Sequence, residues 1–491
     1  MKRAVAILAL MTSGCMSMEP KYVRPDPAVP ASWPVGDPYL TQSEAALPAV
    51  TYKDIFRDPR LQALIDQALI NNRDLMVSVA NIEAARAQFQ IQRAQQFPQV
   101  GASAGVTLTG DRGSSGSGSG SGSGSSGSGK SSKSVTAEYS AGLSVPSFEL
   151  DLFGRLRSLT HAQFERYLAT EAAARATRLT LVAEIANGWL DYAADSSQLA
   201  VSQDTAAAAA KSVQLTQARL NAGISARTDL VQAEQILDTA QADVANQRTL
   251  VAQDVNALQL LVGAPIDPKL LSPSIDEAAP TIAELPPGLS SYVLLRRPDV
   301  VEAEYNLRAA NANIGAARAA LFPKITLTGL LGFASSALTS LFTGGAFGWS
   351  ASANAAYTIF NAGAGRANVR LSEAQREAAV ATYQGTIQSA FRDVADALAR
   401  RGTMGEQLSA RQRQDAAAAE YLRLSEARYK AGVDNYLTTL DAQRSYYSAR
   451  QLLVQTKLTA AQDLVNLYQA LGGDPLLQTA PVQKSPLMSS H

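Results

Sequence analysis

Residues that commonly do chemistry are scarce in this chain of 491 residues, which contains two histidines, His161 and His491, and one cysteine, Cys15. A single cysteine cannot form a disulfide within the chain. A metal site built from histidine and cysteine, or a nucleophile activated by histidine, is nearly excluded for the same reason. The sequence therefore predicts no catalytic residues, no metal ligands and no cofactor, and we expect a protein that is not an enzyme.

Cys15 is the residue with the clearest predicted modification. Two basic residues near the start precede a short apolar run, which ends in Thr12, Ser13 and Gly14. This order is typical of a secretory signal peptide. Small residues directly before Cys15 favour a lipoprotein signal over residues 1–14, cut before the cysteine and followed by acylation, although Thr12 replaces the usual leucine. The alternative is a signal peptide that is cleaved nearby, with Cys15 as an incidental thiol.

Charge and composition exclude some partners and favour long helices. Lys plus Arg and Asp plus Glu number 43 each, so nothing predicts a nucleic-acid partner. Aromatic residues make up only 6% of the chain, which suits long helices with thin seams better than a thick globular core. No stretch is continuously apolar over the ~20 residues that a transmembrane helix needs, so a membrane crossing would have to use β-strands.

The sequence contains an internal two-fold repeat. Four motifs recur at separations of 225, 211, 209 and 210 residues, namely Phe97-Pro98 with Phe322-Pro323, Gly154 with Gly365, Ala218 to Gly223 with Ala427 to Gly432, and Pro265 with Pro475. The separation falls by 14 between the first two pairs, so the first copy carries an insertion there. An unbroken Gly/Ser tract over 113–129 lies in that interval and predicts a disordered spacer loop.

Each copy predicts the same order of elements: a helix, a β-hairpin, a very long helix, a tight glycine turn and a shorter returning helix. In the first copy these are about 75–96, 99–147, 155–220 and 229–261, and in the second about 300–321, 324–360, 366–430 and 437–471. A helix of ~65 residues reaches ~100 Å at 1.5 Å per residue. Such lengths indicate a coiled-coil wall, and an ordinary helical bundle is the alternative.

Four segments, beginning at Val100, Val135, Ile325 and Phe347, alternate apolar residues with Gly, Ser and Thr. Alternation over roughly ten residues is typical of strands that cross a membrane with one face toward lipid, and a soluble half-buried sheet is the alternative. Four strands cannot close, and an open edge is not tolerated in lipid. Eight strands make a barrel filled by side chains, whereas twelve from three chains leave a bore, so the pattern predicts a trimer.

Several motifs resemble the outer-membrane factor lipoproteins of tripartite efflux pumps, the TolC/OprM-type channels. They are Pro20 to Pro25 (PKYVRP), Arg296 to Val300 (RRPDV), Leu321-Phe322-Pro323, and Gly432 to Arg444 (GVDNYLTTLDAQR). The resemblance runs from Cys15 to about Pro475.

The resemblance implies an α+β membrane protein of trimeric form, whose twelve-stranded outer-membrane β-barrel takes four strands from each chain. A long periplasmic α-helical barrel continues from it, with a mixed equatorial domain around the middle. It implies a passive exit duct for drugs or other small molecules. The partners would be two further copies in a homotrimer, outer-membrane lipid, a periplasmic adaptor protein and an inner-membrane RND-type pump. The expected divisions are a signal at 1–14, a tail and equatorial segment at 15–59, repeats at 60–262 and 298–471, a linker at 263–297 and a tail at 472–491.

The resemblance also implies a gate at the periplasmic helix tips. Leu437 and Asp441 would point into the bore as three-fold rings, although Asp441 could instead be the solvated start of a helix, where the dipole favours a carboxylate. Asp434, Tyr429 and Asp229 match positions of hydrogen bonds or salt bridges at the tips. Some relatives carry a basic residue at the position of Asp434, which argues against a salt bridge there.

The turns between the helices are predicted to contact the adaptor. Gly223 and Gly432 follow the long helices at equivalent positions and suit a left-handed helix cap. The small-residue surface around them would be the docking surface, formed by Ala222, Gly223, Ile224, Ser225, Ala431, Gly432 and Val433.

Two rival interpretations stay open. The first is a lipid-anchored periplasmic coiled-coil protein without a pore, which leaves the four alternating segments unused. The second keeps the fold and makes the chain an outer-membrane outlet for type I protein secretion. Such outlets usually lack a lipoprotein start, so Cys15 favours efflux.

Overall fold

The computed structural model describes residues 17–30, 32–34, 36, 39, 51–110, 135–283, 291–343 and 345–473. Cys15 and the Gly/Ser tract at 113–129 lie outside the described residues. The chain divides into two compact units, which are described separately. The sheet unit comprises Met1–Val23, Arg86–Glu165 and Arg308–Glu377, and the helical unit comprises Arg24–Ala85, Arg166–Leu307 and Ala378–His491.

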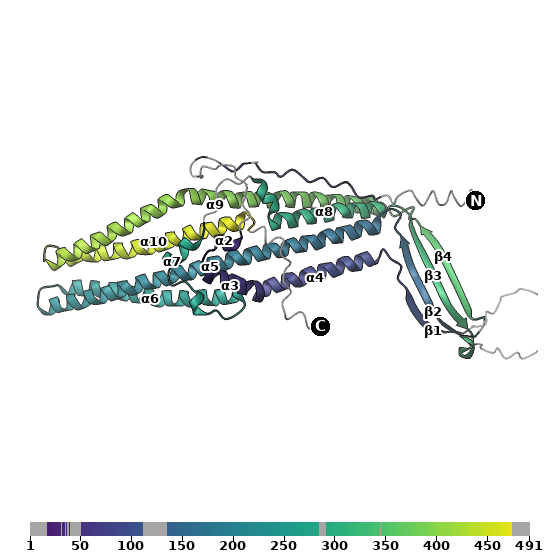
Figure 1. The fold of residues 1–491 in the computed structure, drawn as a ribbon, viewed down its shortest axis with the longest axis horizontal. Helices are drawn as coiled ribbons and strands as arrows, with labels where there is room; N and C mark the ends of the chain where they lie inside the picture. The colour runs from purple at the N-terminus through teal and green to yellow at the C-terminus, as the bar shows by residue number, and fades with distance from the viewer. Residues whose placement is uncertain are drawn as a thin grey trace, which may run out of the picture. The chain divides into compact units, whose positions relative to one another are not determined.

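The sheet unit contains one four-stranded antiparallel sheet in the order β1-β2-β3-β4 (Figure 1). Its strands are β1 (Gly101–Gly110), β2 (Val135–Leu150), β3 (Lys324–Ser335) and β4 (Phe347–Ala356). All four predicted strands are confirmed, and β2 continues to Leu150, past the predicted end of the first hairpin at about 147. A hairpin from each repeat therefore joins through the β2–β3 pair into one sheet.

The two faces of the sheet differ in chemistry because side chains alternate along each strand. One face carries cross-strand apolar rows, such as Leu143 opposite Leu331 and Leu331 opposite Trp349. Leu143, Leu331 and Trp349 are all exposed in the single chain. The other face carries mainly Gly, Ser and Thr, so the sheet has an uncovered apolar face and an uncovered polar face.

Helices make up most of the remaining described chain (Figure 1). The longest are α5 (Arg155–Asn221) and α9 (Ala364–Lys430), each of 67 residues, or ~100 Å long at 1.5 Å per residue. The others of more than one or two turns are α3 (Pro59–Asn71), α4 (Arg73–Ala94), α6 (Arg227–Val262), α8 (Pro298–Ala319) and α10 (Tyr436–Ala470). The predicted long helices and their shorter partners are confirmed.

No described helix carries an apolar stretch long enough to cross a bilayer. The long helices are instead rich in alanine and longer polar residues, which favour helix formation. Their buried positions include Ile185, Trp189 and Leu190 of α5.

Short elements pack against α5 within the helical unit. They are α2 (Tyr52–Ile55), α7 (Ile275–Ala278), η1 (Pro268–Leu270), η2 (Ala279–Thr281) and η3 (Ser291–Arg296). The indole Nε1 of Trp189 donates to the carbonyl of Leu270 at 3.0 Å. The amide of Ile275 donates to the hydroxyl of Ser197 at 2.9 Å. These contacts place segments from between the repeats on the middle of a long helix.

The N-terminal strap, residues 17–30 and 32–34, contains no helix or strand and is held by side chains of later elements. In the sheet unit, the His161 ring lies 3.1 Å from Glu19 and 3.1 Å from Glu165. These hydrogen bonds, first to Glu165 and then to Glu19, raise the pKa of His161 to about 10. The side-chain amide of Asn311 donates to the carbonyl of Pro20 at 2.7 Å.

The strap is also held within the helical unit. Ser291 donates to the carbonyl of Pro30 at 2.8 Å. The rings of Trp33 and Phe391 stack with their centroids 4.9 Å apart.

Candidate functional site

The turn after α5 reverses the chain through a glycine in the left-handed region. Gly223 has a φ of +73°. The amide of Ile224 donates to the carbonyl of Arg219 at 2.9 Å, and the amide of Gly223 donates to the carbonyl of Leu220 at 2.9 Å. This pair of bonds is the Schellman motif, which satisfies the last carbonyls of a helix.

The turn after α9 repeats the same backbone. Gly432 also has a φ of +73°. The amide of Val433 donates to the carbonyl of Arg428, and the amide of Gly432 donates to the carbonyl of Tyr429, both at 3.0 Å. The predicted left-handed caps are confirmed at both glycines.

The crest of each turn is bare. Ile224 and Val433, directly after the glycines, are exposed. A Cβ added at Gly223 or Gly432 would meet nothing within 4 Å. Ala222 and the other predicted docking residues lie on the same two turns, so the structure groups them by turn and leaves their outer surface open.

Asp229 is occupied within the first turn. The hydroxyl of Ser225 donates to Asp229 Oδ2 at 2.7 Å, and the amide of Ala226 donates to the same oxygen at 3.4 Å. A carboxylate in the first turn of a helix accepts the otherwise unpaired donors there and complements the helix dipole. Asp229 therefore caps α6.

Asp434 forms an ion pair in the second turn, which corrects the expectation that it has none. The Nε and Nη2 atoms of Arg428 donate to Asp434 Oδ2 at 2.6 Å and to Oδ1 at 2.9 Å. The reversal at Gly432 brings these side chains together, a contact that sequence position alone does not show. The hydrogen bonds from Arg428 hold the pKa of Asp434 below its ordinary value of 3.8.

Tyr429 is buried in a small cluster between the helices near the turns. Its ring lies 5.1 Å from that of Tyr436, and the guanidinium carbon of Arg219 lies 4.5 Å from the centre of the Tyr429 ring. Among the described residues the Tyr429 hydroxyl has no hydrogen-bond partner. Burial raises the pKa of Tyr436. The tip cluster, as we call it, consists of Ala209, Ala233, Ile236, Tyr429, Tyr436 and Leu440.

Leu437 and Asp441 are exposed, in contrast to the buried residues of the tip cluster. They are four residues apart on α10, so they share one face of that helix. Leu437 is 57% exposed and Asp441 is exposed. The structure thus places these two predicted gate residues side by side on an exposed helix face, whereas Tyr429 is buried.

Polar contacts between the two helical hairpins lie behind the tip cluster. The Tyr447 hydroxyl of α10 donates to Asp243 Oδ2 of α6 at 2.7 Å and lies 3.0 Å from the Ser202 hydroxyl of α5. Gln443 Nε2 donates to the Ser212 hydroxyl at 3.2 Å. These bonds tie the hairpins to one another within one chain.

The sequence did not single out Arg219, Arg428, Tyr436 or Tyr447. A signal existed for the two arginines, because Ala218-Arg219 and Ala427-Arg428 occupy equivalent positions in the repeat. No such signal existed for Tyr436 and Tyr447, since their partners come from other helices.

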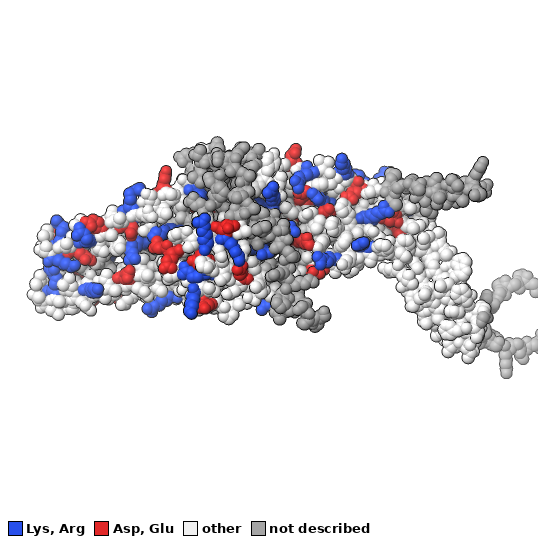
Figure 2. All heavy atoms as spheres, in the orientation of Figure 1, with Lys and Arg blue, Asp and Glu red and all other residues white. Residues whose placement is uncertain are grey.

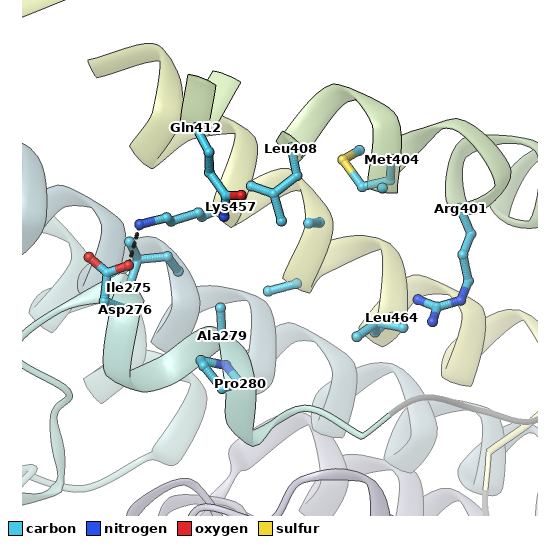
Figure 3. Close-up of a pocket in the computed structure, with 13 residues that line it drawn as sticks. Ile275, Asp276, Ala279, Pro280, Arg401, Met404, Leu408, Gln412, Lys457 and Leu464 are labelled. Carbon is cyan, nitrogen blue, oxygen red and sulfur yellow. Dashed lines mark hydrogen bonds and ion pairs between the residues drawn. The ribbon is translucent and has the colours of Figure 1, made fainter. Parts of the chain in front are cut away.

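A groove of about 710 Å³ lies elsewhere in the helical unit, between α7, η2, α9 and α10 (Figure 3). Met404, Leu408 and Leu464 contribute apolar side chains to its lining, and Lys457 forms an ion pair with Asp276 at its edge. Among the described residues no group of three or more His, Cys, Asp or Glu side chains is placed to hold a metal ion.

Comparisons with known proteins cover nearly the whole chain. A model of the family described as outer membrane efflux protein matches residues 64–264 and 289–473. The toluene efflux pump outer membrane protein TtgC of Pseudomonas putida is 41% identical over 487 residues, which are 97% of this chain and 96% of TtgC. The outer membrane protein OprJ of Pseudomonas aeruginosa is 39% identical over 468 residues, 95% of each chain.

A solved structure shows the same fold. The crystal structure of the open state of the Neisseria gonorrhoeae MtrE outer membrane channel aligns with a TM-score of 0.82 at 34% identity. The alignment covers 93% of this chain and 98% of that chain.

Proposed function

Because this chain belongs to the outer membrane efflux protein family, we propose that three copies of it form the outer-membrane exit channel of a tripartite efflux system. The predicted family, outer-membrane location and role in efflux are confirmed. The homotrimer, the roles of the tip residues and the partners are part of this proposal.

The edges of the sheet support the trimer. Strands β1 and β4 each pair on one side only, and the apolar face is uncovered. In lipid, each unpaired backbone group costs several kcal/mol, so an open sheet must close. Pairing β4 of one chain with β1 of the next, three times, gives twelve strands around an aqueous bore. The apolar rows then contact outer-membrane lipid.

The helices extend the duct into the periplasm, and the chain itself acts as a passive conduit without a catalysed reaction. A periplasmic adaptor and an inner-membrane RND-type pump supply cargo and energy. The name of TtgC refers to toluene. For this chain we propose drugs or other small molecules as cargo.

The helix tips act as the gate and the docking site. Leu437 and Asp441 share an exposed face of α10, and three copies form a hydrophobic plug beside a ring of carboxylates. The exposed crests at Ile224 and Val433 offer apolar contacts to an adaptor hairpin. Opening then requires the second helical hairpin, α9 with α10, to move relative to the first, α5 with α6, which disturbs the contacts of the tip cluster.

Cys15 anchors the chain by its acyl groups. Glu19, only four residues later, is held at His161 near the start of α5. Met16 rather than aspartate follows Cys15, so no inner-membrane retention signal of that type is present. Mass spectrometry of the purified protein should show an acylated Cys15, and an intact Met1 or a free thiol would contradict the anchor.

The main test is assembly and conduction. Native mass spectrometry in mild detergent should show a trimer, and the trimer should form channels in planar bilayers. The gene should also restore drug efflux to a strain that lacks its own outer-membrane component. A stable monomer or dimer would contradict the closed barrel, and a trimer that exports only a type I secretion substrate would support the secretion outlet instead.

A further inference from the structure

The register of the sheet changes once, within β2. Val145 lies opposite Gly329, and Phe148 lies opposite Leu327. Three steps along β2 therefore match two steps along β3, so β2 contains one extra residue. A bulge of this kind moves every later side chain to the other face of the sheet. Without it Glu149 would share the apolar face with Val145. With it Glu149 lies opposite Thr326, on the polar face.

Glu149 holds two cations at this position. Its Oε1 and Oε2 accept from Arg155 Nε at 2.8 Å and from Arg155 Nη2 at 2.7 Å. Lys324 Nζ lies 3.0 Å from the same Oε2. The Glu149 side chain is 13% exposed and that of Lys324 is 55% exposed. These three side chains carry one positive charge in excess, Asp151 offsets part of it at Arg155, and Lys324 carries its own charge toward water.

In the proposed barrel the polar face of the sheet lines the bore, because the apolar face contacts lipid. Gly142 and Gly332 lie opposite one another on the polar face. A Cβ added at Gly142 would come within 2.8 Å of the Leu331 carbonyl oxygen, and one at Gly332 within 2.6 Å of the Ala141 carbonyl oxygen. This close approach of the two backbones leaves no room for a side chain, so only glycine fits at these positions. Gly332 and Lys324 are an even number of residues apart on β3, so they share the polar face.

Charge is otherwise sparse on the sheet. In Figure 2 the visible face of the strands carries no charged side chain over most of its length. Besides Glu149 and Lys324, the described strands contain one charged residue, Glu138. It lies opposite Thr107 near the other end of the polar face. Glu149, Arg155 and Lys324 are thus a local feature of the end from which α5 begins.

We propose that Glu149, Arg155 and Lys324 form a charged collar around the inner end of the barrel bore, which favours the passage of anions over cations. The collar rests on the proposed trimer, since three copies of the polar face must line one bore. Three Lys324 ammonium groups in a ring attract anions, as other rings of charged side chains select ions in pores. Glu149 orders the two cations and lowers their mutual repulsion without neutralising both.

Labelling of single cysteines tests where Lys324 points. The chain has no cysteine besides Cys15, so Lys324→Cys adds one reactive thiol to each acylated chain and three to the trimer. Water-soluble cationic and anionic methanethiosulfonates, added to channels in planar bilayers, should shift the anion-to-cation permeability ratio in opposite directions. Ile325→Cys lies on the other face and should be unaffected. A conducting Lys324→Cys trimer that neither reagent changes would overturn the collar.

Reversal potentials in a KCl gradient test the selectivity. Lys324→Glu should lower the anion-to-cation permeability ratio about threefold, whereas Lys324→Arg should leave it unchanged. Glu149→Gln should raise the ratio, and if that variant fails to assemble, Lys324→Glu decides alone. A trimer that conducts with the parent ratio after Lys324→Glu refutes the collar and leaves the channel intact. Absence of any trimer in the parent would instead refute the proposed function.

Discussion

The turn after α5 and the turn after α9 close with the same two backbone hydrogen bonds around a glycine at a φ of +73°. Their side chains differ. Where the second turn has Asp434 paired with an arginine, the first has Ser225, which donates to its own helix cap. Val231 of α6 is 50% exposed, and Leu440 at the equivalent position of α10 is 2% exposed.

The repeat thus preserves the backbone of the turns and places the additional side-chain contacts in the second helical hairpin, formed by α9 and α10. Tyr429, Tyr436 and Leu440 all come from that hairpin, whereas the first contributes alanines and Ile236 to the tip cluster. If the second helical hairpin moves when the proposed gate opens, its side-chain contacts in the closed state must be able to break and re-form. We therefore expect substitutions at equivalent positions of the two helical hairpins to change stability or conductance unequally where side-chain contacts differ. Where only the shared backbone conformation matters, the changes should be equal.

The largest difference should come from Tyr429. Tyr429→Ala removes a buried aromatic ring from the tip cluster and should lower the free energy of unfolding by about 3 kcal/mol. Leu220→Ala, at the equivalent and less buried position, should cost less than half as much. Tyr429→Phe should be nearly neutral, because the hydroxyl has no partner among the described residues. Denaturant titration of the trimer in detergent measures all three, and equal losses for the two alanine variants would break the comparison.

The two helical hairpins should differ in their effect on conductance. If Leu437 and Asp441 form the proposed plug and carboxylate ring, the double change Leu437→Ala with Asp441→Ala removes both, so single-channel conductance should rise severalfold. Cells should also admit vancomycin without a pump. The matched control, Thr228→Ala with Gln232→Ala, changes the equivalent positions of α6 and should do neither. An intact double-mutant trimer that conducts like the parent would leave Asp441 as a solvated helix start.

The two glycines should respond alike. Alanine at Gly223 or Gly432 has room for its Cβ but must adopt a positive φ, which costs roughly 1 kcal/mol. The thermal midpoint of each variant should therefore fall by the same small amount. A loss confined to one turn would show that side-chain contacts, rather than the shared backbone, set its cost.

The smallest effect should come from the exposed ion pair and should depend on pH. Arg428 lowers the pKa of Asp434 below 3.8, so the folded state binds the proton more weakly than the unfolded state. The stabilisation is present above 3.8 and is lost as the pH falls through the lower folded-state value. The parent should lose its small advantage in thermal midpoint over Asp434→Asn when the pH drops from about 7 to about 2. An advantage that persists at the lowest pH would exclude the ion pair as its source.

Most of the fold could be predicted because it depends on local periodicity. The alternation from Val100 or Phe347 identified strands, and the long helices followed from spacing and from the glycines that end them. The first hairpin was predicted to end at about 147 rather than at Leu150, because the bulge after Val145 reverses the alternation that identified the strand. After the bulge the apolar residues occupy the alternate positions of the strand, so periodicity alone could not show that the segments before and after it form one strand.

The candidate site was less predictable because its contacts join distant parts of the chain. The glycine caps follow from residue type, and both were found. The stacking of Arg219 on Tyr429 requires α5 and α9 to be neighbours, and nothing in their own spacing specifies that. The pairing of Arg428 with Asp434 depends on the side-chain geometry of a completed turn.

The N-terminal strap has a consequence for the order in which the chain folds. Its partners lie far along the sequence: Pro20 is bound by Asn311 across 291 residues, and Asp26 by Gln384 across 358. Contacts of such separation form late, because the elements that supply both sides must already be in place. The strap is synthesised before either of these partners and is therefore among the last segments to dock.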